Sequence, residues 1–263
     1  MTGRCLAASL VIALLAAPVA PAMALEDGGR AIVAEVVDGD TVILEPVIDG
    51  PSQVRLVGIQ APKLPLGRKD YKKWPLADTA KAALMALAEG RAVQLKFGGR
   101  RMDRHGRLLA HLYTEEGTWI QGALLAAGLA RVYSFPDNRA LVPDMLVLER
   151  AARRDGKGIW SVPFYAVRGP ENLEALIDTF QLVEGRVLDA AFVRGNTYLN
   201  FGADWRTDFT VMIDRDAAKL FKAAGDDPLA MKGARIRVRG WLNKRNGPMI
   251  EVSHPEQIEK LDP

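Results

Sequence analysis

The chain has 263 residues, with 35 Lys and Arg against 32 Asp and Glu, a formal net charge of +3. So small an excess does not indicate a polyanion partner by itself, and any such argument must rest on local clusters of charge. The single cysteine, Cys5, lies in an expected leader, so zinc-thiolate chemistry is excluded for the mature chain.

The first 24 residues have the pattern of an export signal. Arg4 supplies a positive charge, residues 6–17 form an apolar run too short to cross a bilayer, and Ala22-Met23-Ala24 is a small-residue cleavage site. We therefore expect cleavage after Ala24 and a periplasmic or secreted protein that is not held at a membrane. The alternative is a single membrane anchor.

Residues 25–160 are predicted to form one domain of five strands and three helices. The strands are expected at the β-branched or alternating runs 31–37, 41–44, 54–59, 93–97 and 108–113. The helices are expected where apolar residues recur at helical spacing, at 75–89, 119–127 and 141–154. This order predicts a β-rich α+β fold built on a small closed barrel of the OB type.

Residues 161–179 are predicted to be a linker, because Pro163, Gly169 and Pro170 interrupt the pattern. Residues 180–263 then have the order β-β-β-α-β-β, which predicts a second OB-like barrel. Its expected elements are 180–193, 197–201, 208–213, the helix 217–223, 234–242 and 248–252. The alternative is one continuous domain.

An acidic turn and an arginine lie close together in the first predicted barrel. Asp38 and Asp40 flank Gly39 at a strand junction, which taken alone is typical of a hairpin turn. Two carboxylates this close repel each other unless a cation lies between them, and oxygen ligands suit Ca²⁺. Arg55, in the next strand, either points to solvent at the sheet edge or binds a phosphate.

A second motif follows in the basic turn Asp103-Arg104-His105-Gly106-Arg107. With the first motif, and with residues 128–133 and Gly158-Ile159-Trp160, it resembles the staphylococcal nuclease (thermonuclease) family over residues 31–160. The resemblance implies an OB-fold barrel and, in active members, Ca²⁺-dependent hydrolysis of DNA and RNA phosphodiesters.

The resemblance also implies roles for individual residues. Arg55 and Arg107 match the arginines that bind the phosphate and stabilise the transition state, and Asp40 matches a metal-binding aspartate. The supporting positions are Asp38, Thr41 and Asp103.

Two positions depart from the family pattern. Active members have Asp-Thr-Pro-Glu or Asp-Ala-Pro-Glu after the arginine strand, whereas this chain has Gln60-Ala61-Pro62-Lys63. Gln60 offers an uncharged, weak metal ligand where a carboxylate is expected. Lys63 takes the general-base position, and an ammonium group has no lone pair with which to accept a proton from water. We therefore expect weak Ca²⁺ binding, and phosphodiester binding with weak or lost hydrolysis. Asp70 is an alternative base.

Residues 64–74 combine basic and aromatic side chains, which suits single-stranded nucleic acid. The candidate contacts are Arg68, Lys69, Tyr71, Lys72, Lys73 and Trp74. The alternative is a solvated loop with a packed Trp74. Aromatic residues also lie on the second and third strands of the C-terminal barrel, and a basic stripe follows at 232–245, where the alternative is a half-buried strand with a charged outer face.

Three functions remain open on these residues. The first is an exported nucleic-acid-binding protein on a nuclease scaffold. The second is an active Ca²⁺-dependent endonuclease that uses another base. The third is a periplasmic protein-interaction module without a nucleic-acid role. Gln60 and Lys63 disfavour the second, and the retained Arg55 and Arg107 favour the first over the third.

Overall fold

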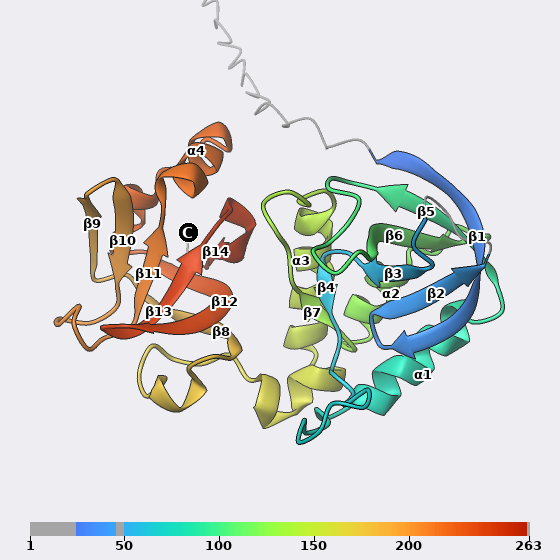
Figure 1. Cartoon of the computed structure of the whole chain (residues 1–263). Helices are drawn as coiled ribbons and strands as arrows, with labels where there is room; N and C mark the ends of the chain where they lie inside the picture. Colours follow the sequence, from blue (N-terminus) through green and yellow to red (C-terminus); the bar gives the residue numbers. More distant parts are fainter. Residues whose placement is uncertain (1–24, 46–49, 262–263) are drawn as a thin grey trace, which may run out of the picture.

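The computed structural model of the protein describes residues 25–45 and 50–261, so the expected leader lies outside the described residues. Two β-rich lobes lie side by side, joined by a segment of short turns (Figure 1). Each lobe has its own hydrophobic core, one built from residues between Ala31 and Leu146 and the other from residues between Leu173 and Val252. No helix in the described ranges is long and apolar enough to span a bilayer.

The first lobe is a closed barrel with the strand order β1-β2-β3-β6-β5. Only β3 and β6 are parallel neighbours. Alternate residues of each strand enter the core, as Val93, Leu95 and Phe97 do in β5. The predicted OB-type barrel is thus confirmed. Its strands are β1 (Glu26–Asp38), β2 (Thr41–Glu45), β3 (Gln53–Leu56), β5 (Ala92–Phe97) and β6 (Leu108–Thr114).

Three helices cover this barrel, as predicted: α1 (Ala77–Ala88), α2 (Ile120–Ala126) and α3 (Val142–Arg154). The inner face of α1 is made of small residues and Leu84, which lets the helix lie close to the sheet. Pro143 falls in the first turn of α3, where its missing N–H breaks no hydrogen bond.

The expected strand 54–59 is wrong as a single element. It is interrupted at Val57 and Gly58, and Gly58 adopts a left-handed φ of 82° that a strand does not accommodate. The chain then forms β4 (Ile59–Gln60), which pairs with β7 (Arg131–Val132) outside the barrel. This turn brings Gln60 beside Arg131.

The second lobe has the strand connectivity of the first. The expected strand 180–193 is interrupted at residues 187–188, and its two halves, β8 and β9, pair with β12 and β10 respectively. The ring therefore runs β8/β9-β10-β11-β13-β12, and β11 and β13 are its parallel pair. The elements are β8 (Phe180–Arg186), β9 (Asp189–Val193), β10 (Asn196–Asn200), β11 (Thr210–Ile213), α4 (Arg215–Ala223), β12 (Arg235–Arg245), β13 (Gly247–Val252) and β14 (Ile258–Lys260), the last not predicted.

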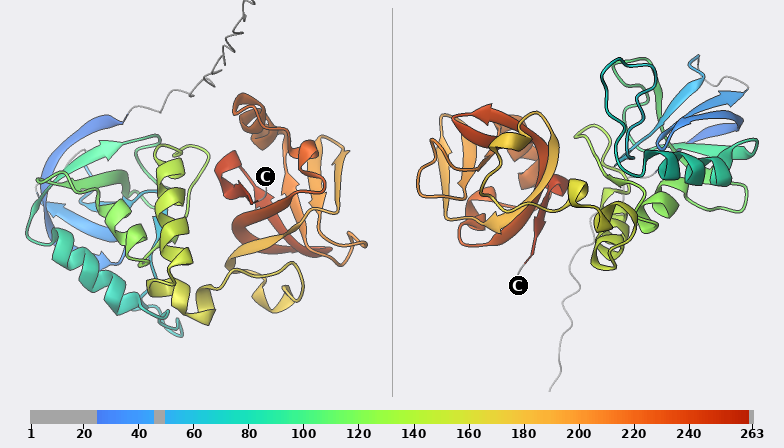
Figure 2. Two further views of the ribbon diagram at one scale, coloured as in Figure 1. Left: turned by 180° about the vertical axis from the view of Figure 1, so that it is seen from behind. Right: turned by 90° about the horizontal axis from the view of Figure 1, so that it is seen from below.

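Figure 2 shows the two lobes from two further sides. Ion pairs join them. Arg239 of β12 is only 1% exposed and donates hydrogen bonds of 3.0 and 2.9 Å to the carboxylate of Glu149 in α3. Arg139 forms a second bridge, 2.7 Å from Glu256. Both interpretations of the basic stripe at 232–245 are therefore wrong for Arg239, whose side chain belongs to the contact between the lobes. The segment predicted as a linker contributes Leu173 to the second core.

Candidate active site

The acidic turn lies buried between β1 and β2. Gly39 is required there because a Cβ atom would come within 2.7 Å of the Cβ of Ala61 and 2.8 Å of that of Ala80. Asp40 is fully buried, and its Oδ2 accepts a 2.7 Å hydrogen bond from the amide of Ala61. Asp38 is almost as buried and accepts a hydrogen bond from the amide of Asp40.

The ammonium group of Lys63 lies between these two carboxylates. Its Nζ is 2.7 Å from both carboxylate oxygens of Asp40 and 3.4 Å from Oδ2 of Asp38. Burial raises the pKa of Asp40, but the charges of Arg55 and Lys63 and the hydrogen bonds it accepts outweigh burial and lower that pKa to about 2. Burial and the charge of Asp40 raise the pKa of Asp38. The carboxylates are thus compensated by a cation that the chain itself provides.

Gln60 is held by a different cation. Its Oε1 accepts hydrogen bonds of 2.9 and 2.7 Å from Nε and Nη2 of Arg131. Arg131 also donates to the carbonyl of Phe180 in the second lobe, and its guanidinium lies 4.5 Å from the centre of the Phe180 ring. Burial lowers the pKa of Arg131 to about 10. Sequence reasoning gave Arg131 no role, although the resemblance included the run that contains it.

This set of donors does not fit a Ca²⁺ ion. Ca²⁺ takes six to eight oxygen ligands, which are carboxylates, carbonyl oxygens and waters. Both oxygens of Asp40 are engaged by Lys63, and the amide oxygen of Gln60 is engaged by Arg131. Within residues 25–45 and 50–261 no group of three or more His, Cys, Asp or Glu is arranged to hold a metal.

Two arginines lie on neighbouring parallel strands, Arg55 in β3 and Arg107 just before β6. Arg55 is the register partner of Thr41, and its Nη1 and Nη2 donate to the carbonyls of Leu56 and Ile59 at 2.7 and 2.6 Å. The guanidinium of Arg107 makes hydrogen bonds of 2.8 and 2.7 Å to Oδ2 of Asp103. Although burial opposes it, the hydrogen bonds from Arg107 and His105 lower the pKa of Asp103. Both arginines are therefore fixed in position before any ligand binds.

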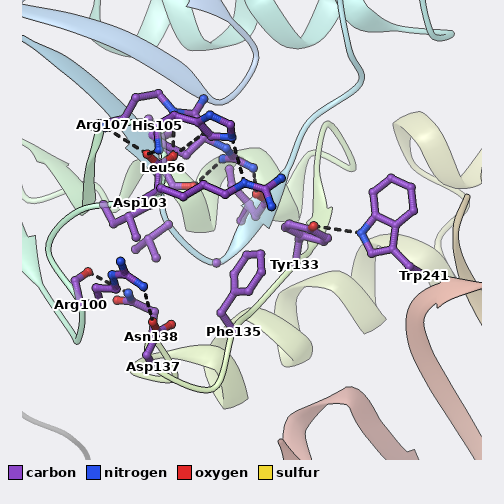
Figure 3. Close-up of a pocket in the computed structure, with 16 residues that line it drawn as sticks. Leu56, Arg100, Asp103, His105, Arg107, Tyr133, Phe135, Asp137, Asn138 and Trp241 are labelled. Atoms are coloured by element: carbon purple, nitrogen blue, oxygen red, sulfur yellow. Dashed lines mark hydrogen bonds and ion pairs between the residues drawn. The ribbon is translucent and has the colours of Figure 1, made fainter. Parts of the chain in front are cut away.

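Arg55 and Arg107 line one cavity of about 460 Å³ (Figure 3). Four arginines and two aspartates line it, a formal charge of 4 − 2 = +2, and these are Arg55, Arg100, Arg104, Arg107, Asp103 and Asp137. The acidic turn and Lys63 do not line it. Lys63 therefore adds no charge to the lining of this cavity, and its ammonium group is paired with Asp38 and Asp40.

An aromatic wall closes the other side of this cavity. Tyr133 and Phe135 follow β7, and Trp241 comes from β12 of the second lobe. The indole Nε1 of Trp241 donates a 3.0 Å hydrogen bond to the hydroxyl of Tyr133 (Figure 3). The second lobe thus contributes to the candidate site, which nothing in the sequence pattern indicated.

The loop 64–74 lies apart from this cavity. Trp74 packs 5.5 Å from the ring of Phe164, which agrees with the alternative of a packed tryptophan. Arg68 stacks over Tyr71 at 3.7 Å, and Lys73 pairs with Asp78 at 2.6 Å. Lys69, Asp70 and Lys72 are exposed and do not line the cavity either. Among the described residues, none of the contacts of the loop brings Asp70 to the acidic turn or to the cavity.

One family model and several curated proteins are similar to this chain. The family model described as "Staphylococcal nuclease homologue" matches residues 53–162. An uncharacterized endonuclease of Escherichia coli O157:H7 is 31% identical over 143 residues, which cover 54% of this chain and 82% of the relative. Protein ParB of Escherichia coli is 30% identical over 60% of this chain and 83% of its own length. Endonuclease YhcR of Bacillus subtilis (strain 168) is 32% identical over 49% of this chain, and the match spans only 11% of YhcR.

The relatives named as endonucleases support a nuclease-like function and a nucleic-acid ligand. The family model covers the part of the first lobe that holds Arg55 and Arg107. The chain belongs to the staphylococcal nuclease homologue family.

Proposed function

We propose that this protein is exported and binds nucleic-acid phosphodiesters in the arginine-lined cavity, with little or no hydrolysis. The observation that carries the proposal is the position of the Lys63 ammonium, 2.7 Å from both carboxylate oxygens of Asp40. The ammonium group occupies the space between the two acidic side chains. Because it is part of the chain it does not exchange with ions in solution, and it cannot accept a proton from water.

Loss of hydrolysis follows from the chemistry of phosphodiester cleavage. Attack by water needs a group that accepts its proton, and such a base contributes roughly 10²–10⁴-fold in rate. A metal ion adds several kcal/mol of charge stabilisation at the phosphoryl oxygens. Lys63 cannot supply the first, and the donor set around Asp40 does not fit the second.

Binding does not depend on either of these groups. Arg55 and Arg107 are oriented by Ile59 and Asp103, and the cavity has an excess of positive charge. Phosphates that contact arginines release counterions, so the affinity should fall steeply with salt. The aromatic wall of Tyr133, Phe135 and Trp241 offers surfaces on which bases can stack.

A binding and cleavage assay with labelled single-stranded DNA tests the proposal. We expect salt-sensitive binding by anisotropy that is equal in Ca²⁺ and in EGTA, with intact DNA on a denaturing gel. Loss of binding in EGTA, or digestion started by Ca²⁺, would contradict it. If cleavage occurs in EGTA, the variant His105→Asn tests the imidazole in the cavity as the replacement base.

The export component is supported by the composition of residues 1–24. Expression of the full chain followed by cell fractionation tests it. We expect a processed protein that begins at Leu25 in the extracytoplasmic fraction. A cytoplasmic chain that retains residues 1–24 would contradict this component alone.

A further inference from the structure

A second hollow, of about 500 Å³, lies on the outer surface of the C-terminal barrel. Its floor is formed by β9, β10, β11 and β13. In Figure 1, β9 and β10 lie at the end of this lobe that faces away from the first barrel. The hollow shares no residue with the cavity around Arg55 and Arg107.

The strand register explains which side chains reach this hollow. In β10, Thr197 and Leu199 are buried, so Tyr198 and Asn200 between and after them face outward. Asn200 lies opposite Thr210 of β11, whose hydroxyl donates to the Oδ1 of Asn200 at 3.3 Å. The floor is therefore an aromatic ring beside amide and hydroxyl groups.

Three loops form the rim. The turn between β9 and β10 supplies Arg194, and the loop between β10 and β11 supplies Trp205. The end of β12 supplies Arg245, and the turn after it supplies Asn246. Trp205 is 50% exposed, and the guanidinium of Arg206 lies 4.5 Å from the centre of its ring. A large aromatic side chain is thus presented to solvent next to several cations.

The charges in the hollow favour an anion. Two arginines, Arg194 and Arg245, and one aspartate, Asp189, line the hollow, and Asp189 lies 2.7 Å from Lys232. Arg245 lies 3.7 Å from Glu251, and both side chains are at least half exposed, which makes this pair weak. Arg194 forms no ion pair with the residues that the structure describes.

We propose that this hollow is a second binding site for single-stranded nucleic acid. Bases stack on Trp205 and Tyr198, and phosphates lie against Arg194 and Arg245. The position agrees with the strand order, because barrels of this type bind oligonucleotides or oligosaccharides on the face of strands two and three, between the loops that follow strands one and four. Positive charge next to stacking surfaces selects the polyanion over a neutral oligosaccharide.

The proposal is independent of the function proposed for the first cavity, and the test measures the contribution of each site to binding separately. Binding of a fluorescein-labelled single-stranded oligonucleotide is measured by anisotropy for the full chain and for Arg104→Ala/Arg107→Ala, which weakens the first cavity. Trp205→Ala is then added to each. The matched control is Phe192→Ala, which removes a 63% exposed aromatic of β9 that does not line the hollow.

In the Arg104→Ala/Arg107→Ala background we expect Trp205→Ala to weaken binding about tenfold, as loss of one stacked base does. Phe192→Ala should leave it unchanged. Unchanged melting temperatures of the variants exclude unfolding as the cause. If Trp205→Ala has no effect, the proposal is wrong whatever happens at Arg107. If the hollow binds a neutral dextran or chitin oligosaccharide and not DNA, the ligand class is wrong.

Discussion

The candidate site of the first barrel has two halves that differ in what they have kept from the family pattern. The arginine half, around Arg55 and Arg107, is fixed by hydrogen bonds and opens into a cavity. The acidic half, around Asp38 and Asp40, is buried and closed by Lys63. Binding of phosphate and activation of water therefore depend on separate groups, and a chain can keep one without the other.

The departures at residues 60 and 63 are also mutually consistent. Gln60 carries no charge, and its amide oxygen accepts a hydrogen bond from Arg131. Arg131 in turn donates a hydrogen bond to the carbonyl of Phe180 in the second lobe. Lys63 then supplies the charge compensation that a metal ion gives in active members. A buried carboxylate without a compensating cation is costly in free energy. If Gln60 weakens metal binding, a lysine at residue 63 is therefore favourable, because its charge compensates Asp38 and Asp40.

The largest expected effect comes from restoring the acidic half. Gln60→Asp with Lys63→Glu replaces the internal cation by two carboxylates, and we expect Ca²⁺-dependent cleavage of single-stranded DNA to rise by at least ~10²-fold. The initial rate of release of labelled fragments measures it.

The matched control for this restoration is Gln60→Asp with Lys63→Gln, which removes the ammonium without adding a base and should stay inactive. In both variants Arg131 can pair with the carboxylate introduced at residue 60 and so compete with Ca²⁺ for it. Arg131→Lys is therefore added if the activity of the restored variant is low. Equal activity of the two double variants would show that residue 63 is not the base position.

Removing the internal cation alone should destabilise the acidic half. Among the residues that the structure describes, Lys63→Met leaves Asp40 paired with Arg55 alone and removes the ion pair of Asp38. Breaking a buried ion pair costs roughly 3–5 kcal/mol. Urea unfolding measures this loss. Lys73→Met breaks an exposed pair with Asp78 and serves as the control, with an expected loss below about 1 kcal/mol. A Lys63→Met protein as stable as the unaltered chain would mean that Lys63 does not compensate these carboxylates.

Acid should weaken the contact between the lobes, which holds Trp241 in the wall of the arginine half. His254 is fully buried, and its Nε2 lies 2.7 Å from the hydroxyl of Ser134. Burial lowers the pKa of His254 from 6.5 to about 4. The unfolded chain binds this proton more readily, so the stability is complete above pH 6.5 and falls by roughly 3 kcal/mol as the pH drops to about 4.

Unfolding in urea between pH 7.5 and pH 4 measures this loss, and His254→Gln should reduce the dependence on pH. Burial also lowers the pKa of His111 to about 4, so part of the dependence should remain in the variant. An unaltered pH profile of His254→Gln would contradict the assignment.

The smallest effect is expected in the arginine half. Arg107→Ala should weaken the binding of single-stranded DNA by about tenfold, since charge-assisted contacts contribute roughly 1.5–3 kcal/mol each. The salt dependence of binding should decrease by about 0.7 in slope for the one lost contact. Arg154→Ala, a 77% exposed side chain away from the cavity, should leave both unchanged. An equal effect of the two variants would indicate nonspecific attraction only.

Most of the element order along the chain was predictable in both lobes, because alternation and turn residues determine individual strands and helices locally. The unusual residues at 60 and 63 were also visible in the sequence. Their partners were not, because Gln60 and Arg131 are 71 residues apart and meet only through the β4–β7 pair. The burial of Arg239 was hidden for a similar reason: an alternating strand looks the same whether its charged face meets solvent or another lobe. Gly58 was the one overlooked local signal for the split of strand 54–59.

Calorimetric titration of Ca²⁺ into the unaltered mature chain, without nucleic acid, tests most directly whether Lys63 occupies the metal position. We predict no saturable binding at Asp40, and a titration that Asp40→Asn leaves unchanged. Saturable binding at one site that is abolished by Asp40→Asn would contradict the account, because Ca²⁺ would then displace the ammonium group from the acidic half.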